Sequence, residues 1–412
     1  MSTPRTSVLT PICTAALFLA ACGNSDAAQE QCATELVTGT TFTVPQTAGD
    51  RSFQAHTTFD GNAIWMTHAS AIAADESIVV KALRIQCDGT ISSEEVGVEA
   101  QEGLQTEPRI TSHGGKVMIA WQHDDQVSST NLSTYYKIFD REEDPATSPA
   151  IRLETQYAGV AAGNTWMPEL DASASGFVLA GLRGVNEYAS FQAFAQRIDF
   201  DGATVGGAIN AQLSDELVQN MVSASLADDG SVVMSWTRES DNELEHAVHV
   251  AVESDSDAPA NEPIRVCTNE CSMVSLGGNE HRGQYVAAVA PDGTIALKPS
   301  TLFNAEAPLL TVGTPGDTPM FPTIAVGPES GAVAWLSQLS GFNAEIHLQA
   351  FTGDGYDISL VGSEAVVPTD NPAIGPYRLS LIHVQDAVYM LTWTEGPTSA
   401  LQVKWRFVDL AQ

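Results

Sequence analysis

Residues 230–236 read Gly-Ser-Val-Val-Met-Ser-Trp, a turn residue followed by an apolar run and a tryptophan, and variants of this motif recur along the chain. Other copies end at Trp65, Trp121, Trp335 and Trp393, and two weaker copies carry Gly181 and Val289 at the tryptophan position. The seven anchors lie 46 to 60 residues apart. A repeat of this period, built from strand-forming residues, is typical of a radial β-array. The sequence therefore predicts an all-β, seven-bladed β-propeller, with six or eight blades as the alternatives.

Each repeat is expected to hold four short strands. In the fourth repeat we expect them at 222–226, 231–236, 247–252 and 263–267. Apolar and β-branched segments separated by Asp-Gly turns are typical of antiparallel blades. The second strands are almost wholly apolar, as expected of strands covered on both faces. A large β-sandwich is the alternative fold, but sandwiches seldom repeat a tryptophan at even spacing.

The two ends of the domain predict how the array closes. The last repeat stops after its third strand, at 403–408, and a strand-like segment at 40–44 precedes the first repeat. Pairing between these two segments would complete the last blade and cover two strand edges. We therefore expect an N-terminal strand that closes the last blade of a propeller domain spanning residues 40–412.

The N-terminus has the pattern of an export signal. Arg5 precedes a mostly apolar stretch at 8–21, which ends in Leu19-Ala20-Ala21-Cys22. A basic start, a short apolar segment and small residues are typical of a secretory signal, and the segment is too short to span a bilayer.

The Leu-Ala-Ala-Cys ending resembles the lipobox of bacterial lipoproteins. The resemblance implies a signal peptide at 1–21, a diacylglycerol and an N-acyl chain on Cys22, and a lipidated tether at 22–39. Gly23 follows the cysteine where an Asp would favour inner-membrane retention, so outer-membrane attachment is expected, with the leaflet open. An ordinary signal peptide with a chance cysteine is the alternative.

Four further cysteines, Cys32, Cys87, Cys267 and Cys271, predict disulfides in an oxidising envelope. Cys267 and Cys271 are close in sequence and are expected to pair. Cys32 would then join Cys87 and tie the N-terminal arm to the first blade. A metal site that adds His281 is the weaker alternative, because an isolated Cys-x3-Cys spacing is poor evidence for zinc. We therefore predict no metal site.

The chain carries 51 acidic and 18 basic residues, a formal net charge of −33. Such a surface repels nucleic acid and anionic lipid, so we expect no nucleic-acid partner and membrane contact through the lipid anchor only. The chain contains no calcium-loop, dinucleotide, phosphate-binding or serine-hydrolase motif. We accordingly expect no cofactor and assign no catalytic residue.

Loop lengths predict which end of the propeller binds. The loops from second to third strands are long and dissimilar, at 123–133, 183–190, 238–246 and 338–344, which is typical of a recognition face. Polar residues stand just past the anchors at the mouth of these loops: His68, His123, Arg183, Arg238, Gln338 and Glu395. We predict that they form a ring that binds an anionic ligand or an acidic loop of a partner. The alternative is that they cap strand ends or pair with neighbouring charges.

These features predict a lipid-anchored binding or scaffolding module of the cell envelope, for a protein or glycan partner at the loop-rich face. The alternative function is an envelope polysaccharide hydrolase or lyase that uses acidic residues at the channel mouth. A surface-coat component without a discrete site is a third possibility. An acidic pair at the loop-rich end would favour the enzyme.

Overall fold

The computed structural model describes Cys32 and residues 36–74, 77–92, 95–99, 103–124, 132–154, 156–157, 160–161, 164–185, 190–211, 217–240, 244–251, 271–279, 283–299, 310–340, 343–353, 357–370 and 378–411. These residues form strands β1 to β29 and one short 3-10 helix, η1 (Pro145–Thr147). The predicted all-β class is therefore confirmed. Among the described residues, no helix is long and apolar enough to cross a membrane.

The largest sheet has two halves. It contains β2 (Arg51–Phe59), β3 (Ile64–Ala71), β4 (Ile78–Ile85), β5 (Val96–Gly97), β6 (Leu104–His113), β7 (Lys116–Asp124), β8 (Leu132–Asp140) and β9 (Ile151–Arg152). A single parallel pair, Ile78 with Leu104, joins β4 to β6. All the other pairings are antiparallel, so β2 to β5 and β6 to β9 each form an antiparallel unit of their own.

The middle of the chain continues the same pattern in sheets that follow one another in sequence. They contain β12 (Thr165–Ser173), β13 (Gly176–Val185), β14 (Ser190–Ile198) and β15 (Thr204–Asn210); β16 (Leu217–Leu226), β17 (Val232–Ser240) and β18 (Leu244–Ala251); β19 (Ser272–Asn279), β20 (Gly283–Val289), β21 (Ile295–Pro299) and β22 (Leu310–Val312); and β23 (Pro319–Val326), β24 (Gly331–Ser340), β25 (Asn343–Thr352) and β26 (Ser359–Val367). A short ribbon pairs β10 (Gln156–Tyr157) with β11 (Val160–Ala161). The strand expected at 263–267 lies outside the described residues.

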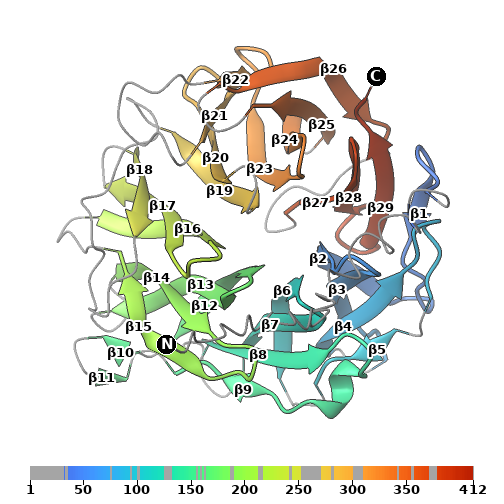
Figure 1. Cartoon of the computed structure of the whole chain (residues 1–412). Helices are drawn as coiled ribbons and strands as arrows, with labels where there is room; N and C mark the ends of the chain where they lie inside the picture. Colours follow the sequence, from blue (N-terminus) through green and yellow to red (C-terminus); the bar gives the residue numbers. More distant parts are fainter. Residues whose placement is uncertain are drawn as a thin grey trace, which may run out of the picture.

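The last sheet joins the two ends of the chain. Its strands are β27 (Ser380–Gln385), β28 (Val388–Glu395) and β29 (Gln402–Asp409), and β1 (Thr41–Thr43) pairs with the free edge of β29. Thr41 lies opposite Arg406 and Thr43 opposite Lys404, so the predicted pairing of the N-terminal strand with the last strand is confirmed. Figure 1 shows the sheets arranged radially, with β2, β6, β12, β16, β19, β23 and β27 nearest the centre, a propeller-like arrangement.

The core lies between neighbouring sheets. The second strands β3 and β28 are buried along their whole length, which explains why their sequences do not alternate regularly between apolar and polar residues. Trp121 packs with Trp65 in a cluster between the two halves of the largest sheet, and Trp335 packs with Tyr285 in a cluster between two sheets. Trp393 packs with Leu336 in a third. The tryptophans of the repeat therefore bridge adjacent sheets, where each contributes a large buried apolar area.

The register shows that the anchors are not all equivalent. On β7, Ala120 lies opposite Arg109 and precedes Trp121, whereas on β3 the corresponding residue, Thr67, precedes His68. His68 therefore occupies the position of the tryptophan in the first repeat, and placing the anchor at Trp65 was wrong by three residues. Trp65 instead packs edge-on against Phe139, with ring centroids 5.5 Å apart. In the fifth repeat Ala287 lies opposite Ser275, so the equivalent residue is Ala288 and not Val289.

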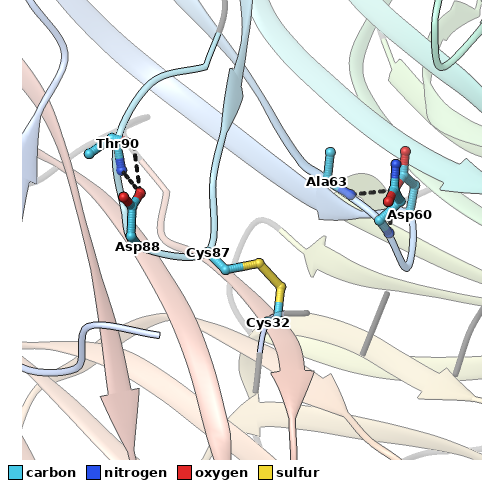
Figure 2. The surroundings of a disulfide bond; sticks show 7 residues. Cys32, Asp60, Ala63, Cys87, Asp88 and Thr90 are labelled. Atoms are coloured by element: carbon cyan, nitrogen blue, oxygen red, sulfur yellow. Dashed lines mark hydrogen bonds between the residues drawn. A yellow bond between two sulfur atoms is a disulfide. The ribbon is translucent and has the colours of Figure 1, made fainter. Parts of the chain in front are cut away.

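A disulfide joins Cys32 to Cys87, with the two Cα atoms 5.1 Å apart, which confirms the predicted pairing (Figure 2). Asp88 stabilises the turn that follows Cys87, because its carboxylate accepts hydrogen bonds from N and Oγ1 of Thr90 at 2.8 and 2.6 Å. Cys271 is also disulfide-bonded, but Cys267 lies outside the described residues, so their pairing stays a prediction. The signal peptide and Cys22 lie outside them as well.

Candidate functional site

The innermost strands share a β-bulge at one position. On β6, Thr106 lies opposite Gln122 and Arg109 opposite Ala120, so two residues of β6 face one residue of β7. The same shift occurs on β2, β12, β16, β19 and β23. Repeated bulges at equivalent places are designed features, since they bend a strand and redirect its side chains.

Each bulge holds a non-glycine residue in the left-handed region. These residues, called the bulge ring here, are Gln54, Glu107, Met167, Met221, Met273 and Phe321, with φ between 46° and 55°. In the last sheet, Arg378 takes the corresponding position in the ring. Ser380 and His56 pair with equivalent residues of their second strands, and Arg378 stands two residues before Ser380, just as Gln54 stands two residues before His56. A side chain in this conformation costs about 1 to 2 kcal/mol, and such conformations cluster at functional sites.

The bulge ring lies toward the loop-rich end of the sheets. Glu107 faces Trp121, three residues before β7 ends at Asp124, which is the end of the strand that precedes the loop predicted at 123–133. Pro108, Pro168 and Pro322 each follow a bulge residue. Proline inside a sheet is tolerated at bulges because no ladder hydrogen bond is needed there. The recognition face predicted from loop lengths and the bulge ring therefore lie at the same end.

The innermost strands surround a central channel of about 560 Å³. Its wall takes residues from β2, β6, β12, β16, β19, β23 and β27, including the bulge ring except Glu107 and Met167. A concave site of this size, with apolar and charged groups together, is typical of small-ligand pockets. The channel is therefore the candidate functional site.

Two arginines share one glutamate in the channel wall. Arg109 donates from Nε to Oε2 of Glu169 at 3.1 Å and from Nη2 to Oε1 at 3.0 Å. Nη1 of Arg378 donates to the same Oε1. Burial alone would raise the pKa of Glu169, but the charges of Arg109 and Arg378 and the two-bond contact hold that pKa below its usual value. Glu169 is therefore an ionised carboxylate held between two guanidinium groups.

Glu107 contacts the same arginine, and its pKa shifts in the direction opposite to that of Glu169. Its Oε1 accepts from Nε2 of Gln54 at 2.6 Å, its backbone N donates to Oε1 of Gln54 at 3.1 Å, and its Oε2 is 3.7 Å from Nη2 of Arg109. Burial raises the pKa of Glu107, although Arg109 and Arg378 partly oppose the shift. Two carboxyl groups thus contact one arginine, and their environments move their pKa values in opposite directions.

His56 adds a neutral imidazole to the channel wall. Its Nδ1 donates to the carbonyl oxygen of Ile110 at 3.1 Å. Burial, together with the nearby charge of Arg109, lowers the pKa of His56 to about 4. The side chain is therefore uncharged at neutral pH, so it adds no positive charge to that of the two arginines.

The opposite arc of the bulge ring is apolar. Met167, Met221, Met273 and Phe321 follow one another on β12, β16, β19 and β23, each at the bulge. Nη2 of Arg378 lies 3.3 Å from Sδ of Met221 and 4.0 Å from Sδ of Met167. Arg378 therefore lies between these four residues, called the apolar arc here, and the charged arc, which consists of Arg378 itself with Glu107, Arg109 and Glu169.

Among the predicted ring residues whose side chains the structure describes, none lines the channel: His68, His123, Arg183, Gln338 and Glu395. His68, His123, Arg183 and Glu395 are 1 to 4% exposed. Four of the predicted residues share one register position on their second strands. Each stands three residues after the strand residue that pairs with Arg109, Glu169, Ser223 or Ser380; they are, in that order, His123, Arg183, Arg238 and Glu395. His68 lies two residues before that position, and Gln338 lies one residue after it.

Several of these residues make local contacts. Nε2 of His68 is 2.5 Å from Oε1 of Glu95. Glu395 accepts from Trp393 Nε1 at 2.8 Å and from Lys404 Nζ at 3.0 Å. Arg183 donates from Nε and Nη2 to Oε1 of Gln192, at 3.0 and 2.6 Å. These are the capping and pairing contacts of the alternative interpretation, and ligand binding at this ring stays a prediction.

The other predicted site residues fall partly outside the described chain. The side chain of Arg238 is not among those described, and Cys267 and His281 of the alternative metal site lie outside the described ranges. Within those ranges, no group of three or more His, Cys, Asp or Glu side chains is placed to hold a metal ion.

Comparison with known proteins identifies the fold and no family. No family model matches the chain, and no curated protein matches it. Many solved structures are similar, among them three with TM-scores above 0.5. A Penicillium chrysogenum α-L-arabinanase complexed with arabinobiose has a TM-score of 0.53 at 12% identity, over 77% of this chain and 98% of that one. A Dyadobacter fermentans protein of unknown function has 0.52 at 6% identity, over 91% and 99%. The polysaccharide lyase Uly1 has 0.51 at 8% identity, over 86% and 89%.

Proposed function

We propose that this protein is a saccharide-binding module whose ligand occupies the central channel. The observation that carries the proposal is the bulge ring, which brings a charged arc and an apolar arc to one end of a channel of about 560 Å³. Saccharides need both kinds of surface, because their hydroxyl groups take hydrogen bonds and their ring faces pack on apolar side chains. The arabinanase and the lyase among the similar structures act on polymers of this class.

The architecture that belongs to this proposal is a seven-bladed propeller. The blades would be β2–β5, β6–β9, β12–β15, β16–β18, β19–β22, β23–β26 and β27–β29 completed by β1. The pairing of β1 with β29 supports closure of the ring through the last blade. The lipobox supports attachment to the cell envelope through Cys22, with the signal peptide removed.

A glycan is the partner we favour over a protein, because the described site is concave and enclosed by strands. The test is calorimetric titration with oligosaccharides of several backbones: arabinose, xylose, galactose and galacturonate. Ser275→Trp would fill the channel from β19 and should abolish binding, whereas Leu360→Trp on the exposed strand β26 should leave binding unchanged. Equal affinity of the wild type and Ser275→Trp would place the ligand outside the channel, and no binding in the panel would contradict the proposal.

A second candidate is hydrolysis or elimination of the bound glycan. The observation that favours it is the pair Glu107 and Glu169, one carboxyl with a raised pKa and one with a lowered pKa, both near Nη2 of Arg109. Paired carboxyl groups with separated pKa values serve as acid and base in glycosidases. We rank this function second because Glu107 does not line the channel.

Turnover is tested by the release of reducing ends or of unsaturated sugars from the same oligosaccharides. An enzyme would lose activity by about 100-fold or more in Glu107→Gln if this residue is the general acid. A pure binding module would release no product.

A further inference from the structure

Two guanidinium groups in the charged arc donate to the same carboxylate. Arg109 and Arg378 both donate to Glu169, and burial raises the pKa of Glu107. The imidazole of His56, which also lines the channel, is neutral. The channel wall thus holds two guanidinium groups in a chain of net charge −33. A buried positive charge is costly unless an anion lies beside it.

Of the two arginines, Arg378 is the one whose guanidinium can still donate a hydrogen bond to a ligand. Its Nη1 donates to Glu169, but Nη2 lies next to the sulfur atoms of Met221 and Met167, at 3.3 and 4.0 Å. A thioether is a weak acceptor, and a guanidinium offers five N–H donors. Within the part of the chain that the structure describes, Nη2 therefore meets sulfur acceptors alone. An anionic oxygen would be a much stronger partner for it.

Arg378 also remains accessible from the channel. Its side chain is 20% exposed, against 4% for Arg109, and it lines the channel wall. Because it lies at the junction of the charged and apolar arcs, a ligand whose anion meets Nη2 would have its body against Met221, Met273 and Phe321. Charge and apolar surface are thus arranged for one ligand that has both features.

We propose that the channel recognises an acidic saccharide, whose carboxylate or sulfate binds Arg378 while its ring packs on the methionine and phenylalanine arc. The proposal rests on the proposed saccharide function and specifies its ligand class. Arg109 is a positioning residue in this arrangement, since its two bonds hold Glu169 in place beside Arg378.

The test compares matched acidic and neutral oligosaccharides by calorimetric titration: sialyllactose with lactose, trigalacturonate with its methyl ester, and a sulfated carrageenan oligosaccharide with its desulfated form. We expect at least one acidic member to bind ten-fold or more tightly than its neutral partner. Arg378→Gln should remove that preference, because only the acidic member carries an anion for the guanidinium to bind. Arg152→Gln, on a side chain that is 50% exposed, is the matched control and should change neither affinity.

Each outcome decides the question. Binding of neutral members with no acidic preference would overturn the proposal and leave the saccharide function standing, whereas no binding by any member would remove both. If Arg378→Gln does not fold, the wild type still decides, because affinity for the acidic member must fall as salt is raised from 50 to 500 mM while affinity for its neutral partner stays constant. The carboxylated and sulfated pairs show which anion is preferred.

Discussion

Arg109 and Glu169 form a two-bond ion pair across neighbouring sheets, with Nε to Oε2 at 3.1 Å and Nη2 to Oε1 at 3.0 Å. Arg109 belongs to β6 and Glu169 to β12, so the pair links two innermost strands at the channel wall. Only 4% of the Arg109 side chain and 15% of the Glu169 side chain are exposed. Removing one partner from such a pair leaves a buried charge uncompensated.

Glu169→Gln should therefore lower the free energy of unfolding by roughly 3 kcal/mol, measured by urea denaturation at pH 7. The matched control is Glu142→Gln, because Glu142 also contacts two arginines, Arg84 at 3.5 Å and Arg141 at 3.6 Å, but its side chain is 70% exposed. Exposed pairs contribute about 1 kcal/mol or less. Equal losses in the two variants would show that the channel network does not stabilise the fold.

His56 predicts a pH dependence of stability. Its pKa falls from 6.5 to about 4 in the folded protein because of burial and the charge of Arg109. Between these pH values the unfolded chain binds a proton at His56 that the folded chain does not, so stability is lost as pH falls through this window. His56→Gln should unfold with a shallower pH dependence, by up to about 1.4 kcal/mol per pH unit. Parallel stability curves of wild type and variant between pH 7 and 4 would contradict this.

The fold was largely predictable because the sequence repeats its strands. Tryptophans and apolar runs mark the second strands, and burial on both faces keeps most of their residues apolar. The strand at 40–44 was predictable because the last repeat lacks a fourth strand, and β1 pairs with β29 as expected. The first anchor was misplaced because Trp65 packs against Phe139, so a tryptophan in the right strand did not define the register.

The residues of the channel wall were not predicted, because the repeat motif marks the second strands and leads to their ends. There the repeat places polar side chains such as Glu395, which pairs with Lys404 of its own sheet. The residues that line the channel stand on the innermost strands, whose sequences vary more. One signal was present: Pro108, Pro168 and Pro322 stand at the same point of three repeats, and proline inside a strand indicates a bulge. The convergence of Arg109, Glu169 and Arg378 depends on how sheets distant in sequence pack around the channel and could not be read from spacing.

Asp386 predicts a backbone effect that is separate from the channel. It lies in the turn between β27 and β28 with a φ of 47°, the left-handed region, and its side chain is exposed. A β-branched residue is strained there, so Asp386→Val should lower the free energy of unfolding by about 1 to 2 kcal/mol. Asp386→Gly should be neutral or stabilising by up to about 1 kcal/mol, because glycine adopts this conformation freely. Thermal unfolding of both variants checks the sign, and a loss in Asp386→Gly equal to that in Asp386→Val would contradict it.

The disulfide between Cys32 and Cys87 closes a loop across a sequence separation of 55 residues and fastens the N-terminal arm near the last sheet. Cross-linking a loop of this length stabilises a fold by about 2 to 4 kcal/mol. The double variant Cys32→Ala, Cys87→Ala should lose that amount in urea denaturation. Because Phe42 packs on Trp405 just after the arm, amide exchange should rise more in β1 than in β28. An unchanged unfolding midpoint, or equal exchange in the two strands, would show that β1 is held by its pairing with β29 alone.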